Sequence, residues 1–218
     1  MSELTSEPFD TGAQEQRHVF EVASSKDIYV GRVVALRSDS VVMPGGGTAV
    51  REVIEHLGAV AVLALDADDQ VTLIHQYRHP LGHRIWELPA GLLDVAGEEP
   101  VLAAQRELQE ETGLAASSWV TLVDVAASPG FTDEVVRVFL ARDVTDVGRE
   151  IPDGDEETDL VSRRVPLSEA VRMALAGEIV NGASVSGILA AHAVLSGAAQ
   201  ARPAETPWQD RPSRFAAR

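Results

Sequence analysis

The 218-residue chain contains no cysteine and only one lysine, Lys26. Without cysteine it can form no disulfide, and it offers neither a thiol nucleophile nor a thiolate ligand for a metal. No apolar run reaches the length that a transmembrane helix needs. The first residues also lack the basic and apolar regions of a signal peptide. We therefore expect a cytoplasmic protein.

Positive charge is scarce throughout the chain. Its 18 Lys and Arg residues face 34 Asp and Glu residues, for a formal net charge of −16. This balance argues against binding to nucleic acid or to an anionic membrane, because both depend on patches of Lys and Arg. A substrate that carries phosphate would need local cations, from a bound metal and a few placed arginines.

Alternation of apolar and polar residues, together with one continuous apolar run over 58–65, predicts strands on both sides of one central helix. The predicted strands cover residues 18–22, 28–40, 50–54, 58–65, 71–76, 119–126, 135–141 and 160–165. The runs 58–65 and 71–76 flank a short turn, so we expect them to form a hairpin. Two further helices are predicted over 168–176 and 184–195. Short strands followed by helices predict an α+β fold with a mixed sheet.

Composition divides the chain into four segments. Residues 1–16 are polar and aperiodic, which predicts a mobile tail. Residues 17–55 hold several strand-like runs and form an N-terminal β segment, and residues 56–196 form the main domain. Residues 197–218 are rich in Ala, Pro and Arg, and we expect them to form a disordered tail.

The stretch 91–114 is predicted to fold as loop, helix and loop. Pro100 suits the first turn of a helix, and Gly113 suits its end, because glycine adopts the left-handed conformation without strain. Within this helix three carboxylates, Glu107, Glu110 and Glu111, follow at i, i+3 and i+4 and therefore share one face.

These three carboxylates repel one another near the helix C-terminus, where the helix dipole disfavours negative charge. Arg106 is the only basic residue of the helix that is near enough to help. A solvated acidic face is the simpler interpretation, but the unrelieved repulsion favours a bound cation. Oxygen ligands alone indicate a hard divalent ion, Mg²⁺ or Mn²⁺.

The same stretch resembles the Nudix box of the Nudix hydrolases, Gly-x5-Glu-x7-Arg-Glu-U-x-Glu-Glu-x-Gly-U with U aliphatic. The matching residues are Gly91, Glu98, Arg106, Glu107, Leu108, Glu110, Glu111, Gly113 and Leu114, with one inserted residue between the first two. The resemblance implies the α/β/α sandwich of that family, with a mixed sheet, over residues 56–196. An antiparallel N-terminal strand segment would precede it.

Within that family the chain resembles the ADP-ribose pyrophosphatases. The similarity lies in the motifs 76–78 and 86–91 and in Pro129, sixteen residues beyond Gly113. It implies Mg²⁺-dependent hydrolysis of ADP-ribose to AMP and ribose 5-phosphate by a homodimer that pairs through residues 17–55. Two alternatives stay open: a Nudix hydrolase of another nucleoside diphosphate derivative, such as NADH or a nucleotide sugar, and a non-catalytic regulator that senses ADP-ribose.

The resemblance also implies roles for single residues. Glu107 and Glu111 would be the principal metal ligands, with Glu110 and the backbone carbonyl of Ala90 assisting, while Arg106 would orient the carboxylates. The candidate substrate-binding residues are Arg78 for a phosphate, Glu134 for a ribose, Arg51 across a dimer, Glu87 and Phe131.

The candidate general base lies in the acidic loop 153–159. Glu156 is the first choice and Glu157 the second, because related pyrophosphatases take the base from a loop at this place. A merely solvated acidic turn is the alternative. Glu110 and Glu134 follow as candidates for the base if neither loop residue serves.

Overall fold

A computed structural model of the chain describes residues 19–149 and 160–218. Its strands are β1 Val22–Val30, β2 Val34–Val42, β3 Thr48–His56, β4 Ala59–Ala64, β5 Gln70–Arg78, β6 His83–Glu87, β7 Ala90–Leu92, β8 Leu114–Ala126, β9 Val135–Asp146, β10 Val161–Pro166 and β11 Arg202–Pro203. Its helices are α1 Pro100–Thr112, α2 Leu167–Leu175, α3 Gly182–Leu195 and the short 3₁₀ helix η2 Phe215–Ala217. Of the helices described, none is long and apolar enough to cross a bilayer.

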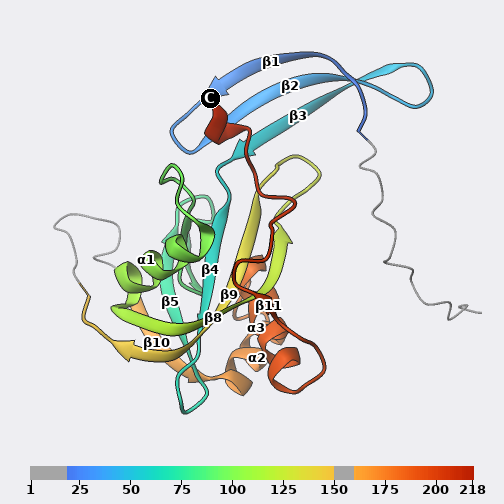
Figure 1. The fold of residues 1–218 in the computed structure, drawn as a ribbon. Coiled ribbons are helices and arrows are strands. Elements are labelled where there is room, and N and C mark those ends of the chain that lie inside the picture. The colour runs from blue at the N-terminus through green and yellow to red at the C-terminus, as the bar shows by residue number, and fades with distance from the viewer. Residues whose placement is uncertain (1–18, 150–159) are drawn as a thin grey trace, which may run out of the picture.

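The strands form three sheets, of which the largest is the mixed sheet that the sequence predicts. Its order is β11-β8-β9-β4-β7, and β4 pairs with β9 in parallel while the other pairs are antiparallel. A second sheet has the order β10-β5-β6. The third, β1-β2-β3, is antiparallel and stands apart from the others at the N-terminal end (Figure 1).

The large sheet separates two apolar cores, which makes the fold a sandwich of helix, sheet and helix. Because side chains alternate along a strand, β4 sends residues into both cores. Val60 and Val62 pack with Ala104 and Leu108 of α1. The alternate residues Ala61 and Leu63 pack on the other face with α2 and α3. Full burial of each such aliphatic side chain contributes about 2 kcal/mol, so both faces of β4 hold the layers together.

The hairpin predicted for residues 58–65 and 71–76 is wrong in its pairing. Only one isolated bridge, Leu65 with Val71, joins the two runs at the turn. Beyond it, β4 enters the large sheet and β5 pairs with β6 and β10. Both runs are buried on both faces, so each needs neighbours that a two-stranded hairpin could not supply.

The prediction of a disordered tail over residues 197–218 is also wrong. We call residues 202–218 the C-terminal arm. β11 pairs with β8, and Ala204 is buried in the core beside α1. The arm continues past the large sheet and ends beside the β1-β2-β3 sheet (Figure 1). Its apolar content is low, but its arginines and Trp208 find partners on the folded domain.

Candidate active site

Helix α1 has the limits that the sequence predicts. Pro100 occupies its first turn, and Gly113 ends it in the left-handed conformation with a φ of 70°. The N–H of Gly113 donates to the carbonyl of Gln109 at 2.8 Å. A glycine here avoids the steric cost that a side chain would meet at this φ, so the chain can turn at once into β8.

The short strand β7 packs closely against the side chain of Glu107 from α1. A Cβ atom added to Gly91 would fall less than 3.0 Å from Cγ, Cδ and Oε1 of Glu107. The Glu107 side chain therefore lies directly over the Gly91 backbone, in space that any other residue would fill. This contact fixes the carboxylate of Glu107 against the strand.

Glu111 joins the same strand by a hydrogen bond. The backbone N–H of Ala90 donates to Glu111 Oε2 at 2.8 Å, and the residue is only 5% exposed. Consecutive residues of β7, Ala90 and Gly91, thus hold two of the three carboxylates that are predicted to bind the metal. The third carboxylate, that of Glu110, has a side chain that is 45% exposed, and it shares Arg106 with Glu107.

Arg106 lies among four carboxylates, as expected for a residue that orients them. Its Nη1 is 2.7 Å from Glu107 and 3.0 Å from Glu110, and its Nη2 is 3.2 Å from Glu98. A fourth carboxylate, that of Asp94, lies at 3.8 Å. Glu98 keeps its contact with the helix despite the inserted residue, since its side chain reaches Arg106.

The electrostatic state of Glu107 follows from its position. Burial raises the pKa of this carboxyl above its ordinary value, and the charge and hydrogen bond of Arg106 oppose the rise. A buried carboxylate is stabilised by positive charge close by, and here one arginine is shared with Glu98 and Glu110. The site therefore favours additional positive charge at the Glu107 carboxylate.

The described residues contain no preformed cluster of three or more His, Asp or Glu side chains that could hold a metal. Arg106 and the Ala90 N–H engage the predicted ligands instead. The donors around β7 and α1 are nevertheless all oxygens, the type that hard divalent cations prefer. Glu107, Glu111 and the Ala90 carbonyl thus fit such an ion chemically, with Glu110 at the rim.

Arg78 is held in place by a buried carboxylate. Its Nη2 lies 2.7 Å from Glu87 Oε2, and its Nε donates to the same oxygen at 2.9 Å. Glu87 is 1% exposed, and its other oxygen accepts from Asn181 Nδ2 at 2.7 Å. Glu87 therefore has almost no surface to offer a substrate, and it fixes the direction of Arg78.

Asn181 connects this pair to helix α3. It is the N-cap of α3, and its Oδ1 accepts from the N–H and the hydroxyl of Ser184, both at 2.9 Å. Ser184 Oγ in turn accepts from the backbone N–H of Leu88 at 2.9 Å. One asparagine thus caps the helix and holds Glu87, while the helix holds the strand end next to Glu87.

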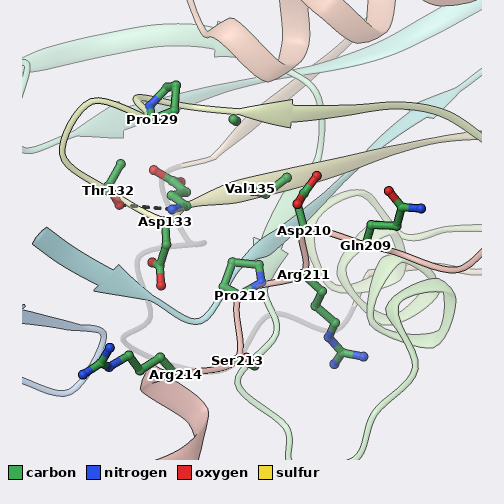
Figure 2. A pocket seen from close by; sticks show the side chains of 12 residues that line it. Pro129, Thr132, Asp133, Val135, Gln209, Asp210, Arg211, Pro212, Ser213 and Arg214 are labelled. Carbon is green, nitrogen blue, oxygen red and sulfur yellow. Dashed lines mark hydrogen bonds between the residues drawn. The ribbon is translucent and has the colours of Figure 1, made fainter. Parts of the chain in front are cut away.

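Glu134 and Phe131 lie on the loop between β8 and β9. We call residues 129–134 the substrate loop. The Glu134 N–H donates to Thr132 Oγ1 at 3.1 Å, and Phe131 is exposed. The loop borders a cavity of about 300 Å³ whose other wall is residues 209–214 of the C-terminal arm (Figure 2).

Arg51 is not brought to α1. Arg51 is exposed on β3, in the N-terminal sheet, where its Nη1 donates to the carbonyl of Val50. Glu156 and Glu157 lie outside the described residues, so the assignment of the base stays a prediction.

Sequence reasoning missed Asn181 and the C-terminal arm as parts of the site's surroundings. A helix-capping signal was present, since Asn181 precedes the predicted helix at 184–195 and asparagine is a favoured N-cap. The arm carries Trp208 and four arginines in its 17 residues, an aromatic and cationic content that suggests docking onto an acidic domain.

The chain is similar in sequence and in fold to known proteins. The family model described as the NUDIX domain matches residues 48–183. The chain is 54% identical over 202 residues to the ADP-ribose pyrophosphatase of Mycobacterium tuberculosis, which covers 92% of this chain and 97% of the relative. It is 40% identical to the methanol dehydrogenase activator of Bacillus methanolicus, over 68% of this chain and 79% of the relative. A crystal structure of an ADP compounds hydrolase shares the fold, with a TM-score of 0.70 at 23% identity, over 83% of this chain and 96% of that one.

Proposed function

The chain belongs to the Nudix hydrolase family, and we propose that it hydrolyses the pyrophosphate bond of ADP-ribose to AMP and ribose 5-phosphate. The observation that carries the reaction type is the contact of α1 with β7, where Gly91 and Ala90 hold Glu107 and Glu111. The substrate is supported by the relative at 54% identity, which is named an ADP-ribose pyrophosphatase.

Members of this family use divalent metal ions, and we propose Mg²⁺, with Mn²⁺ as a substitute. Glu107, Glu111 and the Ala90 carbonyl would hold it, with Glu110 assisting. When bound, such an ion neutralises the anhydride oxygens and lowers the pKa of a coordinated water. Arg106 keeps the carboxylates in place meanwhile, since it contacts Glu107 and Glu110 at once.

The remaining residues would bind and orient the substrate. Arg78 offers its guanidinium to a phosphate, with its direction set by Glu87. Glu134 would accept a hydrogen bond from a ribose hydroxyl, and Phe131 offers an exposed ring beside it. We assign the general base to Glu156, with Glu157 as the second choice; it would take the proton of the attacking water.

We further propose that the protein is a homodimer that pairs through the N-terminal sheet. Every residue of β1 is exposed. The exposed large apolar side chains of this sheet are Val22, Ile28, Tyr29, Val30 and Val50. Apolar surface of this kind marks interaction sites, and a two-fold dimer is the commonest closed assembly. Arg51 lies on the same sheet and would reach toward the partner's site.

A substrate panel with product analysis tests the proposed function. Purified protein with Mg²⁺ is assayed on ADP-ribose, NADH and a nucleotide sugar, because all three contain the same anhydride. We expect the highest kcat/KM for ADP-ribose, with AMP and ribose 5-phosphate as products. A preference for NADH or a nucleotide sugar would assign the chain to another Nudix activity, and no hydrolysis of any of them would favour a non-catalytic sensor.

A further inference from the structure

The C-terminal arm lies outside residues 48–183, which match the family domain, yet it borders the candidate site. We propose that Arg214 and Arg218 of the arm are positioning residues for the substrate loop, acting through Glu55 of β3. This rests on the proposed function in one respect: the loop carries Glu134, the candidate ribose contact.

The arm is anchored before it reaches this region. Arg137 of β9, 2% exposed, donates to both oxygens of Asp124 at 2.7 and 3.0 Å and to the Thr206 carbonyl of the arm at 2.6 Å. Arg202 of the arm donates to Asp124 at 3.0 Å, and the Arg137 guanidinium lies 4.7 Å from the ring centroid of Trp208. These contacts hold residues 202–208 of the arm on the large sheet, so the position at which residues 209–218 begin is fixed.

The arm then closes on one buried carboxylate. Glu55 is 0% exposed. Arg214 Nε lies 2.8 Å from its Oε1, and Arg218 Nε lies 2.6 Å from its Oε2, while Arg37 of β2 also contacts Oε1. Arg218 also pairs with Asp27 of β1 at 2.8 Å. A buried carboxylate persists only when it is paired, and two of its three arginines come from the arm.

The neighbours of Glu55 in β3 hold the substrate loop. The N–H of Ile54 donates to the Phe131 carbonyl at 2.8 Å, and the N–H of Asp133 donates to the Ile54 carbonyl at 3.2 Å. On the other side of Glu55, the N–H of His56 donates to Asp133 Oδ1 at 2.8 Å. A shift of Glu55 would therefore move the strand that fixes Phe131 and Asp133, next to Glu134.

The arm also forms a wall of the cavity at this loop. Residues 209–214 and the loop residues Pro129, Thr132 and Glu134 line the cavity of about 300 Å³ (Figure 2). Arg211 extends the contact toward α1, since its Nη2 donates to the Glu98 carbonyl at 3.4 Å. The arm thus reaches the loop before α1 and also lines the cavity at the substrate loop.

Substitution of the two arginines tests this positioning role. In the Arg214→Ala/Arg218→Ala variant we expect KM for ADP-ribose to rise about tenfold while kcat changes by less than about threefold, because the lost binding is common to the bound substrate and the transition state. Hydrogen exchange of the Ile54 and Asp133 amides should speed up, while that of the β9 amides stays unchanged. Arg214→Lys/Arg218→Lys should restore part of the affinity.

Arg172→Ala is the matched control. Arg172 pairs with two carboxylates, Glu169 and Glu178, but on the exposed surface of α2, and its loss should change neither KM nor the loop amides. Unchanged exchange at Ile54 and Asp133 in the double variant would overturn the proposal. If the double variant does not fold, Arg218→Ala alone is measured and judged by the same amides.

The exchange measurement needs no substrate, so it separates two failures. Faster loop exchange in a protein that does not hydrolyse ADP-ribose would refute the proposed substrate and keep the positioning role. Full ADP-ribose hydrolysis with unchanged KM and unchanged loop exchange would refute the positioning role and keep the proposed function.

Discussion

Replacing Gly91 with alanine should separate catalysis from folding in this protein. The backbone of Gly91 is not in the left-handed region, so alanine is compatible with its conformation. The new methyl group would, however, fall within 3.0 Å of three atoms of the Glu107 side chain. Those atoms are the end of a flexible side chain, so the carboxylate moves and the backbone stays.

The size of the effect follows from the distance that Glu107 must move. Contact between carbon atoms is most favourable at about 3.5–4.0 Å, so relief of the overlap requires a shift on the order of 1 Å. A misplacement of about 1 Å in a catalytic arrangement can lower the rate by about 100-fold, which corresponds to about 2.7 kcal/mol of activation free energy. The free energy of unfolding should fall much less, by about 1 kcal/mol, the lower end for extra atoms in a packed site.

Steady-state kinetics with ADP-ribose and Mg²⁺, together with thermal unfolding, measure both effects. Gly45→Ala is the control, because a Cβ at Gly45 would meet nothing within 4 Å. In a Glu107→Asp background, Gly91→Ala should lower kcat by a smaller factor, because the shorter side chain leaves room for the new methyl group and the two changes are coupled. A Gly91→Ala enzyme with wild-type kcat would refute the idea that this glycine places the Glu107 carboxylate.

Three further predictions concern other parts of the site. Asn181→Ala should raise KM about tenfold by freeing Arg78. Asn181→Ser keeps the helix cap but loses the bond to Glu87, so it should raise KM by a similar factor. Steady-state kinetics of both variants measure this, and an unchanged KM in Asn181→Ser would contradict it. Burial alone would raise the pKa of Glu55, but hydrogen bonds from arginines outweigh it and lower that pKa. The resulting stability is present above the ordinary value of about 4.3 and is lost as pH falls through the lowered pKa, so unfolding curves of Glu55→Gln should depend less on pH there. Glu156→Gln should lower kcat far more than it changes KM, and Glu157→Gln should lower kcat less. A near-normal kcat in both variants would mean that another residue is the general base.

The parts of the fold with strong local signals were predicted correctly. Pro100 and Gly113 set the limits of α1 because each fits one backbone conformation. Most of the predicted runs became strands, but the run 28–40 is divided by a turn between β1 and β2, and the pairing of the strands was harder to predict. Residues 58–65 and 71–76 look alike in sequence, and only the parallel partner β9 assigns β4 to the large sheet.

The C-terminal arm escaped prediction because its stability comes from contacts distant in sequence. Arg218 pairs with Asp27 and Glu55, 191 and 163 residues away, and no local pattern records such pairs. A composition rich in Ala, Pro and Arg suggested disorder, yet the arm docks largely through arginines on buried or half-buried carboxylates.

The acidic face of α1 was the part of the site that sequence predicted best, since helical periodicity alone puts Glu107 and Glu111 together. What periodicity does not give is the partner surface. The Ala90 N–H and the bare backbone of Gly91 receive these side chains, and they come from a strand of three residues that is too short to be recognised by alternation.

Our central claim is that the acidic face of α1 forms the active site of a metal-dependent hydrolase. The most direct test is ADP-ribose turnover in Glu107→Gln and Glu111→Gln. Both substitutions keep side-chain size and remove one charge. With Mg²⁺, the wild-type protein should release AMP and ribose 5-phosphate, and each variant should lose at least about 100-fold in kcat while thermal unfolding shows a folded protein. Turnover near the wild-type rate in both variants would contradict the assignment.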